Sequence, residues 1–135
     1  MRQIHQLTQV LVRVISSMVG LRSPGKADQA VEISNKVLNE QLDLDVKALL
    51  EMDTRKMIQE LEGLPGMNHE NLEHMADLFF ELASILSEED GSDIDYQKLL
   101  KRSLFIYKYI ESEGNIYSID RNHKISEIEK LLTEG

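Results

Sequence analysis

Apolar residues recur with the period of an α-helix along most of the chain. Near the start they follow one another at steps of three or four positions, as Ile4, Leu7, Leu11, Val14, Met18 and Leu21. That spacing places them on one face of a helix. The long segments do not show the strict apolar–polar alternation of a half-buried strand. The pattern therefore predicts an all-α fold of antiparallel helical hairpins, as a TPR-like right-handed α-α superhelix or a bundle.

Turn-forming residues divide this pattern into parts of one domain. The chain has 135 residues, a length typical of a single domain with its own core. Ser23-Pro24-Gly25 predicts a turn between two helices that we expect to be antiparallel neighbours. The predicted parts are a hairpin over residues 2–41, irregular short helices over 42–67, a hairpin over 68–111 and a C-terminal helix over 118–133.

Residues 42–67 leave two interpretations open. Leu42-Asp43-Leu44-Asp45 alternates as a strand does, but a run this short between helical patterns is better explained as an ordered loop. Two short helices are predicted after it, over 46–52 and 54–61, with Asp53 or Thr54 as the N-cap of the second. The region either completes a third hairpin or covers the core.

The first helix carries more apolar surface than one buried face needs. Its main stripe is widened by Val10, Val12, Ile15 and Val19. A membrane-surface helix would pair such a stripe with a polar face rich in Lys, whereas this helix has only Arg2 and Arg13 as basic residues. We therefore expect it to pack against another helix, in the same chain or in a second copy.

Charge and cysteine content exclude several classes of function. The chain has no Cys, which excludes disulfides, zinc knuckles, thiol catalysis and iron–sulfur clusters and fits the reducing cytoplasm. Its net charge of −9 disfavours nucleic-acid binding. Residues 1–27 contain four basic and no acidic residues, so 11 basic and 24 acidic residues give the remainder −13. Arg13 interrupts the longest apolar stretch, and we predict a soluble chain without a membrane partner.

Two segments resemble tetratricopeptide (TPR) repeats. Residues 25–30 look like the turn and second helix of a repeat, with Ala30 at the small position where the two helices pack closely. Met18 departs from the small residue usual in the first helix. Residues 79–86 and 103–107 resemble a second, looser unit. The whole pattern also resembles a small group of bacterial TPR-like proteins, which implies a fold and a bacterial cytoplasmic setting but no activity.

The TPR resemblance implies a non-enzymatic module that binds a protein or peptide partner. In such domains the first helix of each hairpin lines the binding groove. The positions that match are Val12, Ile15, Val19 and Arg22 in the first unit and Asp77, Phe80 and Ser84 in the second. An arginine in this groove pairs well with a peptide carboxylate. The resemblance implies no cofactor.

The segment with the most candidate metal-binding or catalytic side chains follows the predicted N-cap Asn68. His69-Glu70-Asn71-Leu72-Glu73-His74 nearly matches the zinc-protease pattern His-Glu-x-x-His, but Glu73 stands where the second His belongs. On a helix, His69 pairs with Glu73 and Glu70 with His74 on different faces. A metal ion needs three or four converging ligands, so ordinary ion pairs are the expectation. The alternative is a metal-binding protein or enzyme centred on this segment.

The remaining candidate features favour structural roles. The acidic segment 88–95 lacks the residue order of a calcium-binding EF-hand loop and is typical of a solvated turn. We expect most of the aromatic residues near the C-terminus to be buried in the core, namely Tyr96, Phe105, Tyr107, Tyr109 and Tyr117. No nucleophile elbow or phosphate-binding glycine loop is present. A third hypothesis is a structural homodimer whose interface is the first helix.

Overall fold

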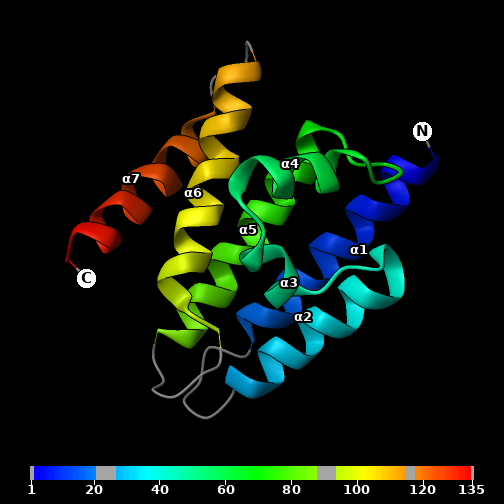
Figure 1. The fold of residues 1–135 in the computed structure, drawn as a ribbon, viewed down its shortest axis with the longest axis horizontal. Helices are drawn as coiled ribbons and strands as arrows, with labels where there is room; N and C mark the ends of the chain where they lie inside the picture. Colours follow the sequence, from blue (N-terminus) through cyan, green and yellow to red (C-terminus); the bar gives the residue numbers. More distant parts are fainter. Residues whose placement is uncertain (1, 21–26, 88–93, 115–117, 135) are drawn as a thin grey trace.

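A computed structural model describes residues 2–20, 27–87, 94–114 and 118–134, and within them the protein is all-α (Figure 1). The helices are α1 Arg2–Val19, α2 Ala27–Leu42, α3 Val46–Glu51, α4 Thr54–Glu62, α5 His69–Leu86, α6 Tyr96–Glu113 and α7 Ile119–Glu134. Each predicted helix is present, with ends that differ by one or two residues from the sequence pattern. The all-α prediction is confirmed.

Side-chain caps set several of these helix ends. The carboxylate of Asp53 accepts a hydrogen bond from the backbone N–H of Lys56 at 2.8 Å, so Asp53 rather than Thr54 is the N-cap of α4. Asn68 caps α5 in the same way, as predicted. Asp43 has a φ of 54°, in the left-handed region that Asp tolerates better than most residues, and it ends α2. The segment after α2 is therefore an ordered loop.

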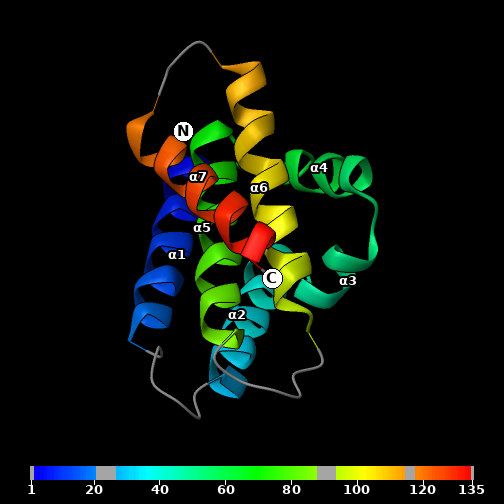
Figure 2. The same cartoon turned by 90° about the vertical axis from the view of Figure 1, so that its left-hand side faces the viewer.

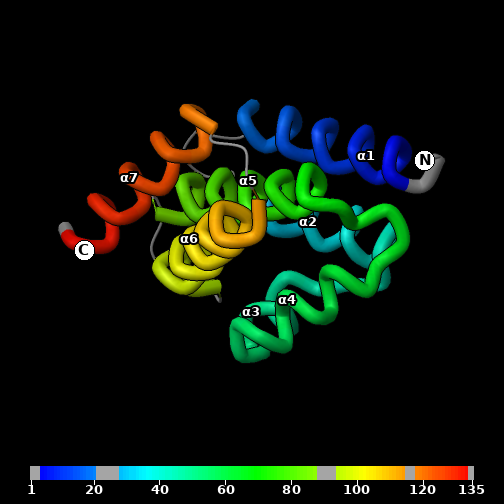
Figure 3. Tube along the Cα trace, turned by 90° about the horizontal axis from the view of Figure 1, so that it is seen from above, coloured from blue at the N-terminus to red at the C-terminus, as the bar shows by residue number. Residues whose placement is uncertain are grey.

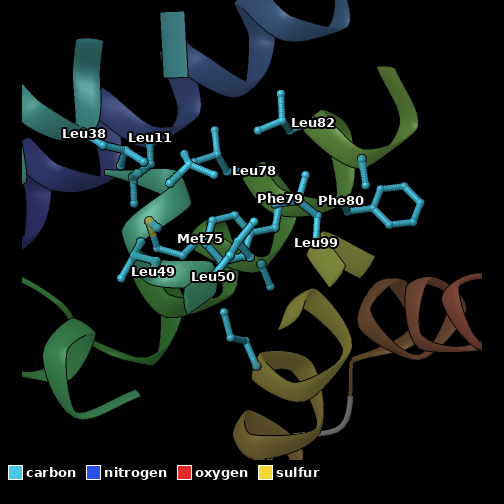
Figure 4. Close-up of a cluster of buried hydrophobic side chains, with 14 of the residues drawn as sticks. Leu11, Leu38, Leu49, Leu50, Met75, Leu78, Phe79, Phe80, Leu82 and Leu99 are labelled. Carbon is cyan, nitrogen blue, oxygen red and sulfur yellow. The ribbon is translucent and has the colours of Figure 1, made fainter. Parts of the chain in front are cut away.

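The core is built around α5, which is apolar on most of its circumference. Figure 3 shows α5 between α1 and α6, and these two helices are its main neighbours. Ten labelled side chains of the core appear in Figure 4, among them Leu11 of α1, Leu38 of α2 and Leu99 of α6. The α5 residues with at most 1% exposure are Asn71, Leu72, Met75, Ala76, Leu78, Phe79, Leu82, Ala83 and Leu86. A helix buried on this many sides fixes the positions of the others.

The first helix packs mainly against α5 and only secondarily against α2. A polar contact specifies this pairing: Asn71 of α5 is fully buried, accepts a hydrogen bond from Thr8 Oγ1 at 2.6 Å and donates one to the carbonyl of Ile4 at 3.1 Å. On the α2 side, Met18 is buried and accepts a hydrogen bond from Ser34 Oγ at 3.1 Å. Residues 2–41 therefore join the core mainly through the contact of α1 with α5.

Residues 42–67 cover one side of α6. The short helix α3 packs against α2 and α6, and α4 packs against α6. Arg102 of α6 donates a hydrogen bond from Nη2 to the carbonyl of Met52 at 2.6 Å, at the end of α3. Tyr109 of α6 donates its hydroxyl to Glu62 Oε2 at 2.6 Å, at the end of α4. These contacts place α3 and α4 against α6.

The last helix is peripheral. It packs mainly against α6 and lies on the near side of that helix in Figure 2. Ile128 is fully buried, whereas Ile119 is 65% exposed and Leu131 is 40% exposed. Among the described residues, no helix is both long and apolar enough to span a bilayer.

Candidate functional site

Two of the predicted binding residues on α1 lie at its surface. Val12 is 43% exposed and Val19 is 50% exposed. They are seven positions apart and so share one flank of the helix. Ile15, between them, is partly buried against the core. Arg22 lies outside the described residues. We call Val12, Ile15 and Val19 the α1 flank.

The predicted binding residues on α5 are less accessible. Phe80 is 8% exposed and belongs to the buried core, so it offers little surface to a partner. The hydroxyl of Ser84 donates a hydrogen bond to the Phe80 carbonyl at 3.0 Å. The side chain of Asp77 is 16% exposed and is already paired. The sequence pattern placed these residues on the correct helix but did not show that other parts of the fold bury this side of it.

Asp77 is the centre of a polar cluster between α5, α6 and α7. It accepts hydrogen bonds from the hydroxyl of the fully buried Tyr107 and from Lys124 Nζ, the latter at 2.7 Å. His74 Nδ1 lies 3.6 Å from its second oxygen. Burial opposes ionisation of Asp77, but the contacts from His74, Lys124 and Tyr107 outweigh burial and hold its pKa below the ordinary value. Burial and the neighbouring Asp77 carboxylate raise the pKa of Tyr107, which keeps its proton and acts as a donor.

Arg121 of α7 extends the cluster across two helices. Its Nε donates to Glu111 Oε1 of α6 at 2.6 Å, and its Nη1 donates to Glu73 Oε1 of α5. The Arg121 side chain is 9% exposed, whereas those of Glu73 and Glu111 are 31% and 30% exposed, so the triad joins a buried cation to two partly exposed carboxylates. We call the five charged residues Glu73, Asp77, Glu111, Arg121 and Lys124 the α7 anchor.

The sequence alone did not predict this anchor. Arg121 and Lys124 belong to no recognisable motif, and Tyr107 was expected only as a core aromatic. One signal was present: Arg121 and Lys124 share a face with Ile125 and Ile128, so both cations lie toward the apolar side of the helix. Cations on the inner face of a helix require buried carboxylate partners.

The charged residues of the His69–His74 segment have other partners than the predicted ones. Glu73 pairs with Arg121 rather than with His69, and His74 pairs with Asp77 rather than with Glu70. The ring of His69 makes an edge contact with Tyr109, with centroids 6.5 Å apart. Within the described part of the chain, no group of three or more His, Cys, Asp or Glu side chains is placed to hold a metal ion.

The acidic segment 88–95 is described only at its end, because residues 88–93 lie outside the described residues. There Asp95 is the N-cap of α6 and accepts a hydrogen bond from the backbone N–H of Gln97 at 3.0 Å. Tyr117 also lies outside the described residues. Among the other aromatics, Tyr107 is fully buried and Phe105 is 36% exposed, so one face of α6 is core and another is open.

Two surface cavities lie away from the α7 anchor. One, of about 160 Å³, is lined by Gln6, Leu7, Val10, Gln41, Leu42 and Pro65. The other, of about 290 Å³, is lined by Asp28, Val31, Glu32, Asn35, Asp45, Lys47 and Ile94. Neither contains a residue of the anchor or of the α1 flank, so the paired acids and bases of the anchor are not arranged around a described cavity.

No family model, curated protein or solved structure matches this chain. The TPR resemblance therefore rests on the residues of segments 25–30, 79–86 and 103–107 alone.

Proposed function

We propose that this chain is a non-enzymatic, TPR-like helical interaction module of the bacterial cytoplasm, and that the α1 flank binds an acidic, partly apolar segment of a protein partner. The observation that carries the proposal is the pair of exposed valines, Val12 and Val19, on a helix that contains no acidic residue. Isolated exposed valines are ordinary on protein surfaces. Two on one flank, within a stretch of 27 residues that has no acidic residue, favour binding of a partner there.

The chemistry of the flank indicates what that partner is. Residues 1–27 carry four positive charges, and Arg13, next to Val12, is exposed. A segment with apolar side chains next to Asp or Glu would bury the valines and place its carboxylates close to this positive charge. An amphipathic helix of this composition is a common form for such a segment.

The fold supports recognition at this flank by holding α1 rigidly. The opposite side of α1 is buried through Leu7, Leu11, Val14 and Met18. Thr8 and Asn71 fix its position along α5 by their hydrogen bond. A preordered helix loses little conformational entropy when it binds, so even a small flank can contribute to affinity.

Selection from a phage-displayed library of random peptides, with the full chain as target, tests the proposal. We expect selected peptides to be rich in Asp and Glu around apolar residues at helical spacing. Val12→Asp should weaken the binding of a selected peptide by about tenfold or more, because the substitution puts a carboxylate where the peptide's own carboxylates approach. Leu131→Asp is the matched control, since Leu131 is 40% exposed on the distant α7.

Two results would contradict the proposal: selected peptides without an acidic bias, or equal binding by the Val12→Asp and Leu131→Asp variants. Light scattering on the same proteins tests the alternative hypothesis of a homodimer. A concentration-dependent dimer that is lost in Val12→Asp would assign the flank to a second copy of the chain instead. Val12 is the residue to change for this purpose, because Leu11 is fully buried and an aspartate there would disrupt the core.

A further inference from the structure

The apolar contacts that hold α7 are few. Among its described side chains, Ile128 is the one apolar residue that is fully buried. Ile125 and Leu132 are partly buried against the core, while Ile119 and Leu131 are largely exposed. An isolated helix of this length is marginally stable in water and depends on such contacts. Apolar packing therefore gives α7 a weak attachment compared with α1 or α5.

The polar contacts of α7 are directional by comparison. Arg121 reaches Glu73 of α5 and Glu111 of α6, and Lys124 reaches Asp77 of α5. All three carboxylates lie on the α5–α6 hairpin, which has the most extensive contact of any two helices in the structure. The hairpin thus presents three acids, together with the hydroxyl of Tyr107, and α7 supplies two cations that pair with them.

A second observation limits what α7 contributes to the rest of the fold. Nearly all of the buried core residues lie on α1 to α6, and Ile128 is the core residue that α7 provides. Figure 1 shows α7 diverging from α6 toward its C-terminal end, so its firmest attachment is at the end that carries Arg121 and Lys124. The hairpin and the other helices keep their mutual contacts without it.

We propose that α7 is a detachable helical ligand of an acidic surface formed by Glu73, Asp77 and Glu111, and that a basic helix with the same spacing of side chains can replace it there. The replacing helix carries Arg and Lys at positions i and i+3 and an aliphatic residue at i+7, the spacing of Arg121, Lys124 and Ile128. This surface is separate from the α1 flank, so either proposal can fail without the other.

Partly buried ion pairs suit an exchangeable contact. Their mutual attraction is largely offset by the loss of hydration, so they fix the geometry of a contact more than they strengthen it. If α7 leaves, Glu73, Asp77 and Glu111 become a hydrated acidic patch that attracts basic segments. A competitor that brings the same two cations restores the ion pairs that α7 made with Glu73, Asp77 and Glu111.

The first experiment is amide hydrogen exchange on the full chain, followed by mass spectrometry. We expect residues 119–134 to exchange through an opening that leaves residues 72–83 of α5 protected. Arg121→Gln should speed exchange in α7 by about tenfold or more without changing α5, because Glu73 and Glu111 lose their partner. Lys108→Gln is the control, since its pair with Glu129 is 3.6 Å long and both side chains are about half-exposed.

The second experiment adds α7 in trans. A fluorescein-labelled peptide of residues 118–134 is titrated onto the wild-type chain and onto the full-length Arg121→Gln/Lys124→Gln variant. We expect binding to the variant to be about tenfold tighter or more, because its own helix no longer occupies the surface. The same peptide with both substitutions should bind neither protein.

Either experiment can overturn the proposal. If α7 and α5 exchange together in the wild type, α7 is part of the cooperative fold and does not detach. If the labelled peptide binds the wild type and the variant equally, or does not bind the variant, the acidic surface is not a docking site for a helix with this spacing of cations. Protection of residues 72–83 in the variant shows that the variant is folded. If the variant does not fold, the exchange pattern of the wild type still decides whether α7 opens separately from α5.

Discussion

At the scale of single residues, the buried polar groups determine which helices pair. Asn71 is fully buried and satisfied by partners from α1 and from the loop before α5: it accepts from Thr8, and its Nδ2 also donates to the Gly66 carbonyl at 2.8 Å. Apolar stripes alone fit several pairings, whereas a buried amide with specific partners fits one. The Asp77 cluster has the same role between α5, α6 and α7.

The His74–Asp77 pair makes stability depend on pH in a known direction. The contact with Asp77 raises the pKa of His74, partial burial opposes this, and the nearby carboxylates of Asp77, Glu70 and Glu73 add to it. A raised histidine pKa contributes stability that is complete below about pH 6.5, the ordinary value, and is lost as pH rises through the folded-state pKa. Asp77, whose pKa is lowered, contributes stability above about pH 4 that is lost as pH falls through its own folded-state value.

We therefore expect the free energy of unfolding to decline on the alkaline side of pH 6.5 by a few tenths to about 1 kcal/mol through His74, because the pair is partly solvated. Urea denaturation at a series of pH values between 5 and 8.5 measures this. His74→Gln should flatten the decline, and the exposed His123→Gln should leave it unchanged. An equal slope in wild type and His74→Gln would show that the pair does not contribute.

At the scale of the elements, the helices were predictable and their pairing was not. Local signals such as the apolar period, the cap Asn68 and the turn glycines act within a few residues, so the helix ends differ little from the prediction. The preference of α1 for α5 depends on contacts between residues more than sixty positions apart, such as Thr8 with Asn71. The candidate site has the same limit: the exposure of Val12 and Val19 depends on the rest of the fold, as does the burial of Phe80 and Asp77.

The cap of α5 gives a prediction at this scale. The side chain of Asn68 accepts a hydrogen bond from the backbone N–H of Asn71 at 2.9 Å, and that N–H has no intrahelical partner at a helix start. Asn68→Ala should lower the free energy of unfolding by about 1 kcal/mol, measured by urea denaturation. Asn68→Asp is the matched control, since aspartate caps equally well. Equal losses in both variants would indicate that the amide is needed for another contact.

At the scale of the whole molecule, the two sides of α1 have different roles. Its inner side is part of the core through Leu11, which is fully buried, while Val12 on the outer flank is 43% exposed. The proposed binding function requires that changes on the flank leave the fold intact. This requirement is met if α1, α5 and α6 unfold as one cooperative unit and only the inner side of α1 contributes to its stability.

The neighbouring residues Leu11 and Val12 test this division. Leu11→Ala removes buried methyl groups and leaves a cavity against α5, so it should lower the free energy of unfolding by about 2–5 kcal/mol. Val12→Ala should change it by less than about 0.5 kcal/mol. Thermal unfolding followed by circular dichroism and by hydrogen exchange in α5 should give one shared midpoint for Leu11→Ala, lower than that of the wild type. A separate early transition confined to α1, with α5 unaffected, would mean that α1 is an appendage and that the α1 flank is not a rigid platform for a partner.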